Sequence, residues 1–336
     1  MKYDVYGIGN ALVDMEFKVN DEFFTDNNVE KGLMTLVEED RQNELLEVLH
    51  TMQNDEIKKA CGGSAANTVI AVSQFGGNSF YSCKVSNDET GKFYLGDLKE
   101  NGVHTKYTPE TAPEGTTGKC MVMVTPDAER TMNTYLGITA TFGEDELVEE
   151  EIKNSKWLYI EGYLVASPSG QKAALKAKKI ARENGVKVAF TMSDPNMVKF
   201  FRDNVAEILD GGVDLLFCNE AEAMEFTQTD DMMKAREEMK KHAKRFAITL
   251  GKNGAILWDE TTFIDIEPYK TTAVDSNGAG DMFAGAFLYA LTHGHGMADA
   301  GSLASLASSK IVSQFGPRLT WAEAKEVVNQ FTESNE

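Results

Sequence analysis

The feature that most constrains the fold is an alternation of short apolar segments with longer segments of helical periodicity. Such an alternation is typical of a mostly parallel β-sheet that carries helices on both faces. We therefore expect an α/β protein. The predicted strands are 3–9, 79–85, 157–160, 186–191, 214–218 and 246–250, and the predicted helices are 64–75, 89–101, 171–184, 203–209 and 232–243.

Two stretches interrupt this alternation. Residues 15–37 alternate apolar and polar side chains, and residues 117–136 have the pattern of a β-hairpin. We expect them to form a small β-sheet inserted into a main α/β domain of residues 1–14, 38–116 and 137–336. Beside a cleft such a sheet could act as a lid. The alternative is that both stretches are edge strands of the main sheet.

Length and charge restrict the class of protein. The chain has 336 residues, of which 42% are hydrophobic, so it can form one large domain or a main domain with an appendage. Its formal net charge is −20, which disfavours binding to nucleic acid or to an anionic membrane surface. An anionic substrate therefore needs a local positive site, supplied by helix N-termini, Lys, Arg or a metal ion.

The cysteines indicate a reducing compartment. Cys61, Cys83, Cys120 and Cys218 show no CxxC spacing and lie in apolar or strand-like surroundings, so we expect reduced, buried thiols. Asp4 stands where a signal peptide would be apolar, and no apolar run approaches the length of a membrane span. We expect a soluble cytoplasmic protein.

The segment 274–281, Val-Asp-Ser-Asn-Gly-Ala-Gly-Asp, leads directly into an apolar helix. The first N–H groups of a helix lack internal partners and lie at the positive end of its dipole. Gly278 and Gly280 would let the backbone approach a phosphate, and Asp281 could take a proton from an attacking hydroxyl. This layout is typical of phosphoryl transfer. The alternative is that Asp281 only caps the helix or interacts with its dipole.

Other nucleotide and metal motifs are excluded. Residues 7–12 begin like a dinucleotide fingerprint, but the third glycine is missing and Asp14 comes too early to bind a ribose. Gly-Lys pairs at 91, 118 and 251 lack the following Ser or Thr of a P-loop. The five histidines show no zinc-binding spacing.

Two elements are suited to a sugar. Asn10 and Asp14 follow the first predicted strand, and an Asp at such a strand end can accept hydrogen bonds from a vicinal diol. Gly63 precedes the helix that carries Asn67 and permits close approach of a ligand to the backbone. Taken singly, the first is also an ordinary turn, and the second a helix start capped by Ser64.

Two further elements are suited to a nucleotide and its metal. Asn219 and Glu222 share one face of a helical turn and could hold hydrated Mg²⁺. Thr249, Gly251 and Gly254 follow another predicted strand in a glycine-containing loop. Taken singly, these are a capped, acidic helix start and an ordinary turn.

All five elements occur in one order, and as a set they resemble the PfkB, or ribokinase-like, family of carbohydrate and nucleoside kinases. The resemblance extends from about Asp4 to Pro317. The family usually has Thr where this chain has Ser276, which keeps the hydroxyl. The resemblance implies a Rossmann-like, ribokinase-type three-layer sandwich with a small β-sheet lid.

The resemblance also implies roles for single residues. Asp281 would be the general base of an ATP-dependent kinase. The other implied roles are the anion hole (amides of Asn277, Gly278, Ala279 and Gly280), the ATP site (Thr249, Gly251 and Gly254), support of Mg²⁺ through water (Asn219 and Glu222), a K⁺ site (Asp275) and the sugar portion of the acceptor (Asn10, Asp14, Gly63 and Asn67).

The spacing of Asn10 and Asp14 and the Gly-Gly-Ser-x-x-Asn element resemble adenosine kinases and their bacterial relatives, whereas ribokinases more often have Gly-Gly-Lys-Gly-Ala-Asn. A nucleoside acceptor is favoured, with adenosine receiving the γ-phosphate of ATP on its 5′-hydroxyl. The alternative is a sugar such as ribose, fructose or 2-keto-3-deoxygluconate. In this family the lid can also form a homodimer interface, and the sequence leaves monomer and dimer open.

The predicted lid has two further candidate features. Arg130 aligns loosely with an arginine that neutralises the γ-phosphate in adenosine-kinase-like members, although it could equally be a solvated hairpin residue. A purine needs an apolar surface for stacking. The residues that could supply it, or could instead form the core of the lid, are Leu33, Met34, Met121, Met123 and Tyr135.

Overall fold

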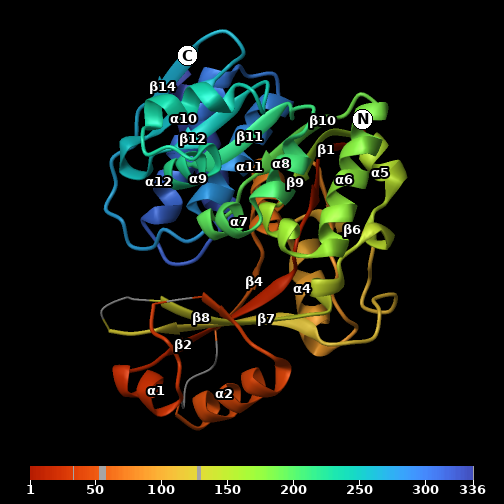
Figure 1. Cartoon of the computed structure of the whole chain (residues 1–336), viewed down its shortest axis with the longest axis vertical. Helices are drawn as coiled ribbons and strands as arrows, with labels where there is room; N and C mark the ends of the chain where they lie inside the picture. Colours follow the sequence, from red (N-terminus) through yellow and green to blue (C-terminus); the bar gives the residue numbers. More distant parts are fainter. Residues whose placement is uncertain (33, 53–57, 127–129, 336) are drawn as a thin grey trace.

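The computed structural model describes residues 1–32, 34–52, 58–126 and 130–335. Its larger sheet has nine strands, ordered β14-β13-β12-β11-β10-β9-β1-β5-β6, and occupies the upper part of Figure 1. Strand β13 pairs antiparallel with β12 and with β14, and the other neighbouring strands of this sheet pair in parallel. The bounds are β1 (Tyr3–Ile8), β5 (Ser79–Ser82), β6 (Val103–Thr105), β9 (Ser155–Ile160), β10 (Lys187–Thr191), β11 (Leu215–Asn219), β12 (Phe246–Thr249), β13 (Ala255–Trp258) and β14 (Phe263–Ile266).

Alternate side chains of these strands enter two separate hydrophobic cores, one on each face of the sheet. The three-layer sandwich is thereby confirmed, and each strand and helix predicted for it overlaps an observed element. One face is covered by α3 (Ser64–Gln74), α4 (Glu89–Glu100), α11 (Ala279–Thr292), α12 (Met297–Val312) and α13 (Trp321–Asn335), and the other by α5 (Glu149–Lys153), α6 (Pro168–Glu183), α7 (Pro195–Phe200), α8 (Arg202–Leu209), α9 (Glu220–Thr227) and α10 (Met232–Met239).

A second sheet of five strands, ordered β3-β8-β7-β2-β4, crosses below the first in Figure 1. The prediction had counted β4 with the main domain. It had also expected only strands within 15–37, where the Asn20 side chain instead accepts from Phe23 N–H and caps a short helix. The bounds are β2 (Leu12–Lys18), α1 (Asp21–Asp26), β3 (Met34–Leu36), α2 (Glu39–Met52), β4 (Lys58–Gly62), β7 (Thr117–Val124) and β8 (Arg130–Gly137).

The lower face of the five-stranded sheet packs on α1 and α2 (Figure 1). Met121 and Met123 lie beside Met15 and Phe17 in the β2–β7 register, and all four are buried in this packing. The two methionines on β7 therefore belong to the core of the small sheet and offer no surface to a purine. Leu33 lies outside the described residues.

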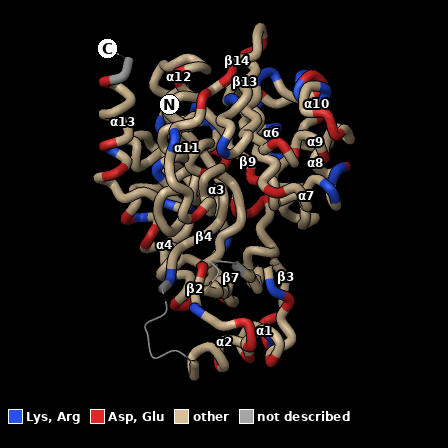
Figure 2. Tube along the Cα trace, turned by 90° about the vertical axis from the view of Figure 1, so that its left-hand side faces the viewer, with Lys and Arg blue, Asp and Glu red and all other residues tan. Residues whose placement is uncertain are grey.

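The acidic residues that the structure describes are distributed over several elements and do not form a single cluster. Acidic residues lie along α10 and α13 and beside α1, with basic residues between them (Figure 2). The four cysteines are free and buried, as predicted. In the part of the chain that the structure describes, every helix is too short or too polar to cross a membrane.

A close crossing of α3 and α11 positions the loops that precede these two helices. A Cβ added to Gly285 of α11 would lie 2.6 Å from Ala71 Cβ and 2.7 Å from Thr68 O, both on α3. Only a glycine allows the two helices to approach this closely. Because Gly285 is one turn after Asp281, the crossing brings the first turns of both helices together.

We predict that Gly285→Ala lowers the free energy of unfolding by about 1–3 kcal/mol, because the added methyl group meets backbone as well as side-chain atoms. Gly96→Ala is the matched control in α4, where an added Cβ has no atom within 4 Å. That change should stabilise the protein by about 0.5–1 kcal/mol. Denaturant unfolding of both variants checks the pair, and equal effects would contradict the crossing argument.

Candidate active site

The site lies where the strand order of the large sheet reverses. β1 lies between β5 and β9, and ligands of open α/β sheets bind beyond the carboxyl ends of strands at such a point. Asn10 follows β1 and Glu161 follows β9 at this edge. Asn219 and Thr249 end the neighbouring strands β11 and β12 as direct partners in the register. The residues predicted from strand ends therefore share one edge of the sheet.

Asp281 is bound by the other helix of the crossing. Its Oδ1 accepts a hydrogen bond of 2.6 Å from Ser64 Oγ, and its Oδ2 accepts one of 2.9 Å from Asn67 Nδ2. The N-cap of α3 is Gly63, without a side-chain cap. Ser64 therefore does not cap α3, and the carboxylate of Asp281 is directed toward α3 rather than back on its own helix.

Burial raises the pKa of Asp281 to about 6, although the hydrogen bonds from Ser64 and Asn67 and the charge of Arg318 act to lower it. Asp281 as a whole is half-buried at the first turn of α11. A carboxylate with this pKa is ionised at neutral pH and is a stronger base than an exposed aspartate. This suits proton abstraction from an alcohol.

Glu161 is a site residue that the sequence analysis missed. Its side chain is 1% exposed and accepts hydrogen bonds from Asn10 N at 3.1 Å and from Ala65 N at 2.8 Å. Burial raises its pKa to about 7, the backbone hydrogen bonds lower it, and the charge of Asp281 raises it further. The position could have been found by the rule used for Asn10, because an acid directly follows a buried strand.

Arg318 is the second missed residue. Its Nε donates to Asn67 Oδ1 at 2.8 Å, and its Nη1 donates to Asp97 Oδ2 of α4 at 2.5 Å. Nothing in the local sequence distinguishes it from the other cations of the chain. Only the fold brings a residue 251 positions after Asn67 into contact with it.

The predicted acceptor residues form a continuous group. Asn67 contacts Asp281 directly, and Gly63 lies against the Asn10 carbonyl, where an added Cβ would be 2.4 Å from the oxygen. Gly62 lies against Asp14 in the same way, because an added Cβ would lie 2.7 Å from the carboxylate oxygens. Gly63 has φ of +101° and touches the Asn10 carbonyl, so the backbone conformation alone requires a glycine there.

The loop at the start of α11, which the sequence predicts to bind an anion, has two glycines in different surroundings. Gly278 has φ of +75°, and an added Cβ would lie 2.5 Å from Pro317 Cβ. Gly280 has open space at the same position. Ala279 N donates to Ser276 O at a long 3.3 Å. A bond of this length engages the Ala279 amide only weakly, and the positive end of the α11 dipole lies at the same loop.

Asp275 joins this loop to the chain that precedes Arg318. One carboxylate oxygen accepts from Asn277 N at 2.9 Å, and the other accepts from Gly316 N at 3.2 Å. The amide of Asn277, predicted to bind the phosphate, is thus engaged within the loop. Asp275 anchors two segments whose positions depend on one another.

Asn219 and Glu222 form a reciprocal capping box at the start of α9. Asn219 Oδ1 accepts from Glu222 N, and both the amide and the side chain of Asn219 donate to the Glu222 carboxylate at 2.8 Å. Burial raises the pKa of Glu222 to about 7. At the neighbouring strand end, Gly254 is held by backbone contact, since an added Cβ would lie 1.9 Å from Ile266 O.

Comparisons with known proteins identify relatives of the chain. Residues 33–324 match the pfkB family carbohydrate kinases. The crystal structure of adenosine kinase from Sinorhizobium meliloti is 33% identical, with a TM-score of 0.87 and coverage of 98% of this chain and 100% of that one. A probable sugar kinase from Rhizobium etli CFN 42 is also 33% identical, with a TM-score of 0.87 and coverage of 98% and 99%. The adenosine kinase of Dictyostelium discoideum is 26% identical over 94% of this chain and 96% of its own length.

The chain belongs to the PfkB family of carbohydrate kinases. The predicted family, the ribokinase-like fold and the class of reaction, phosphoryl transfer to an alcohol, are thereby confirmed. Kinases of this family use ATP as co-substrate with Mg²⁺. The roles of single residues and the identity of the acceptor are taken up below as proposals.

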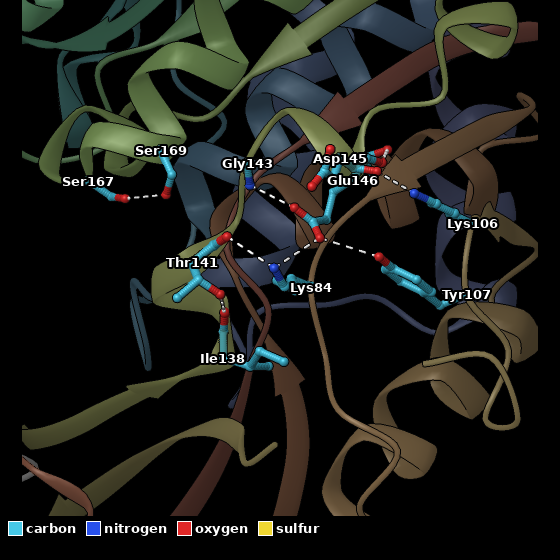
Figure 3. Close-up of polar contacts among 11 residues, drawn as sticks. Lys84, Lys106, Tyr107, Ile138, Thr141, Gly143, Asp145, Glu146, Ser167 and Ser169 are labelled. Atoms are coloured by element: carbon cyan, nitrogen blue, oxygen red, sulfur yellow. Dashed lines mark hydrogen bonds and ion pairs between the residues drawn. The ribbon is translucent and has the colours of Figure 1, made fainter. Parts of the chain in front are cut away.

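In this PfkB kinase, a group of buried polar contacts holds the segment that leads from β8 back to the large sheet. Glu146 is 2% exposed, pairs with Lys84 at 3.1 Å and accepts from Tyr107, while Lys84 also donates to Thr141 O (Figure 3). In the same segment, the hydroxyl of Thr139 accepts a hydrogen bond from Ala11 N, just before β2. The chain that leaves β8 and the chain that enters β2 are thus joined where they pass between the two sheets. The side chain of Arg130, at the start of β8, lies outside the described residues.

The raised pKa of Glu161 predicts a dependence of stability on pH. Because the folded-state pKa is about 7 and the reference value is 4.5, the stabilisation is complete below pH 4.5 and is lost as pH rises through 7. In Glu161→Gln this loss should shrink by on the order of 1–3 kcal/mol. Denaturant unfolding at pH 5 and 7.5 measures this difference in stability, and Glu100→Gln, at an exposed position, is the control. An unchanged difference in Glu161→Gln would show that burial does not perturb this carboxyl.

Proposed function

We propose that this PfkB kinase transfers the γ-phosphate of ATP to a primary hydroxyl of a nucleoside, with adenosine accepting at its 5′-oxygen. The observation that carries the proposal is the 33% identity with the Sinorhizobium meliloti adenosine kinase over 98% of the chain. The Gly-Gly-Ser-x-x-Asn element supports it, because Ser64 and Asn67 both contact Asp281 in this structure.

In the proposed mechanism Asp281 accepts the proton of the acceptor hydroxyl as that oxygen attacks the γ-phosphorus in line. Ser64 and Asn67 hold the two carboxylate oxygens and so fix the direction of the basic lone pairs. The amides of Gly278, Ala279 and Gly280 and the dipole of α11 stabilise negative charge on the transferring group. The open space beside Gly280 supports an approach of phosphate there.

The acceptor lies, in this proposal, between the strand ends and the five-stranded sheet. Asn10, Asp14, Gly63 and Asn67 bind its sugar portion. The face of the sheet opposite α1 and α2 carries Leu12, Met132 and Leu136, which are half-buried and alternate with the core positions of their strands. Together with the exposed Met34, also on that face by register, they supply the apolar surface that a purine requires. Closure of this sheet as a lid would exclude water from the transfer.

The residues near the nucleotide fit Mg²⁺ and K⁺ as oxygen donors. Asn219 and Glu222 bind one another, so they would support Mg²⁺ through water, as its preference for hydrated oxygen sites allows. When bound, Mg²⁺ neutralises phosphate charge. We assign Asp275 to a K⁺ site, where its carboxylate already joins two loops. Thr249, Gly251 and Gly254 would line the ATP site.

A free-sugar acceptor is the second candidate, because the equally similar Rhizobium etli protein is described as a probable sugar kinase.

The proposal extends to the oligomeric state and the location of the protein. Met34 and Leu36 are 47% and 58% exposed on the edge strand β3, which suits a homodimer formed through the small sheet. A cytoplasmic location agrees with four free thiols.

The acceptor is tested by ADP release from ATP with Mg²⁺ and K⁺ across adenosine, inosine, guanosine, ribose, fructose and 2-keto-3-deoxygluconate. We expect turnover with adenosine well above that with any free sugar. Turnover confined to one sugar would replace the nucleoside proposal while keeping the family and the catalytic assignments. Product analysis by phosphorus NMR identifies the oxygen that receives the phosphate.

The role of Asp281 is tested by Asp281→Asn, which keeps the shape of the side chain and removes the base. We expect kcat to fall by about 10²–10⁴-fold while ATP binding and the unfolding transition change little. In the unmodified enzyme, kcat/KM should rise with pH through about 6, because the ionised carboxylate is the active form. Near-normal turnover of the variant would exclude Asp281 as the base.

A further inference from the structure

Arg318 is connected to the proposed base through one intermediate side chain. Its Nε donates to Asn67 Oδ1 at 2.8 Å, and Asn67 Nδ2 donates to Asp281 Oδ2 at 2.9 Å. Asn67 is 6% exposed, so these contacts are largely protected from water. The three side chains form a series of hydrogen bonds from a guanidinium to the carboxylate.

This series of hydrogen bonds fixes the orientation of the Asn67 amide. An amide presents an acceptor oxygen on one side and a donor nitrogen on the other. Because Arg318 can only donate, it requires the oxygen to face it, and the nitrogen must then face Asp281. Without Arg318 the amide could rotate and present its oxygen to the carboxylate, which would repel it.

Arg318 is itself held from three directions. Asp97 of α4 accepts from its Nη1 at 2.5 Å. Gln314 donates to the Arg318 carbonyl at 3.4 Å, and Gln74 of α3 donates to the next carbonyl, that of Leu319, at 2.7 Å. The Arg318 side chain is 14% exposed. Its place is therefore set before any acceptor binds.

The charge of Arg318 acts in the same direction as the geometry. Burial raises the pKa of Asp281, and Arg318 is the cation that opposes this. The other titratable groups around Asp281 increase the cost of its charge or are neutral at pH 7. The groups that face it from the adjoining elements are Glu161, Tyr159 of β9, Tyr163 of η3 (Gly162–Ala166) and Arg318.

We propose that Arg318 is a positioning residue that, held by Asp97, orients the Asn67 amide and keeps Asp281 in the ionised, correctly directed form that accepts the proton. The inference rests on the proposed function of Asp281 as the base. It does not depend on which alcohol is the acceptor.

The test is Arg318→Met, which keeps much of the side-chain length and removes charge and donors. We expect kcat to fall about 10- to 100-fold with KM for ATP within about twofold. The acidic limb of the kcat/KM profile should move to higher pH by roughly one pH unit. Arg318→Lys, which restores the charge with a single donor group, should recover part of both effects.

A second readout does not require turnover. The ¹³Cγ signals of labelled aspartate report ionisation directly, and the Asp281 signal is assigned by its disappearance in Asp281→Asn. In Arg318→Met this signal should titrate at higher pH than in the unmodified protein. If no acceptor in the panel is phosphorylated, the proposed function fails, while this titration still decides whether Arg318 controls the state of Asp281.

Two comparisons separate positioning from a structural effect. Arg245 pairs with Glu260 at 2.8 Å on the far edge of the sheet, so Arg245→Met should leave kcat, the pH profile and the titration unchanged. Asp97→Ala should act in the same direction as Arg318→Met, and the double variant should lose less than the sum.

Either of two results would overturn the proposal. One is an unchanged Asp281 titration and pH profile in a folded Arg318→Met protein. The other is a rise in KM for the acceptor with kcat preserved, which would mean that Arg318 binds the acceptor instead of orienting the base. Its Nη2 atom, buried and without a hydrogen-bond partner among the described residues, makes that second result a real alternative.

Discussion

The site depends on the close crossing of α3 and α11. Gly285 lets the helices approach until an added methyl group would clash with Thr68 and Ala71. Both helices begin at the carboxyl edge of the sheet, so the crossing brings together two helix N-termini and directs Ser64 and Asn67 at Asp281. A base placed by two hydrogen bonds from a second rigid helix is better oriented than one on a free loop, because each helix is fixed by its own packed face.

The electrostatics of the site follow from that crossing. The chain has a net charge of −20, and burial raises the pKa of Asp281, Glu161 and Glu222 in one region. Such a site would repel a polyphosphate unless positive charge were concentrated locally. Two converging helix dipoles, the glycine amides and the Arg318 guanidinium provide part of that charge, and a nucleotide brings Mg²⁺ with it. The buried acidic groups therefore explain why a polyphosphate would enter this site together with a metal ion.

The parts of the structure that local pattern determines could be predicted from the sequence. Buried parallel strands have short apolar segments, so β9 to β12 and their helices were recognisable, and polar residues just after strands marked Asn10 and Asn219. The helix α1 was missed because the alternation of Met15, Phe17 and Val19 was extended past Asn20, although the adjacent Phe23 and Phe24 do not continue it. β4 was missed because its pairing with β2 is set by the sheet and not by its own residues. Arg318 could not be found, since its role depends on contacts with α3 and α4 that only the tertiary fold creates.

The glycines of the motifs were predicted to admit a ligand, and the structure gives two of them a further reason. Gly278 and Gly63 were assigned to ligand approach, yet an added Cβ at either would first meet protein atoms, of Pro317 and Asn10 respectively. Their immediate task is to let two chain segments touch with φ in the left-handed region. Gly280, by contrast, faces open space and has no such internal requirement. Of the three, it is therefore the position that best fits the proposed approach of a phosphate.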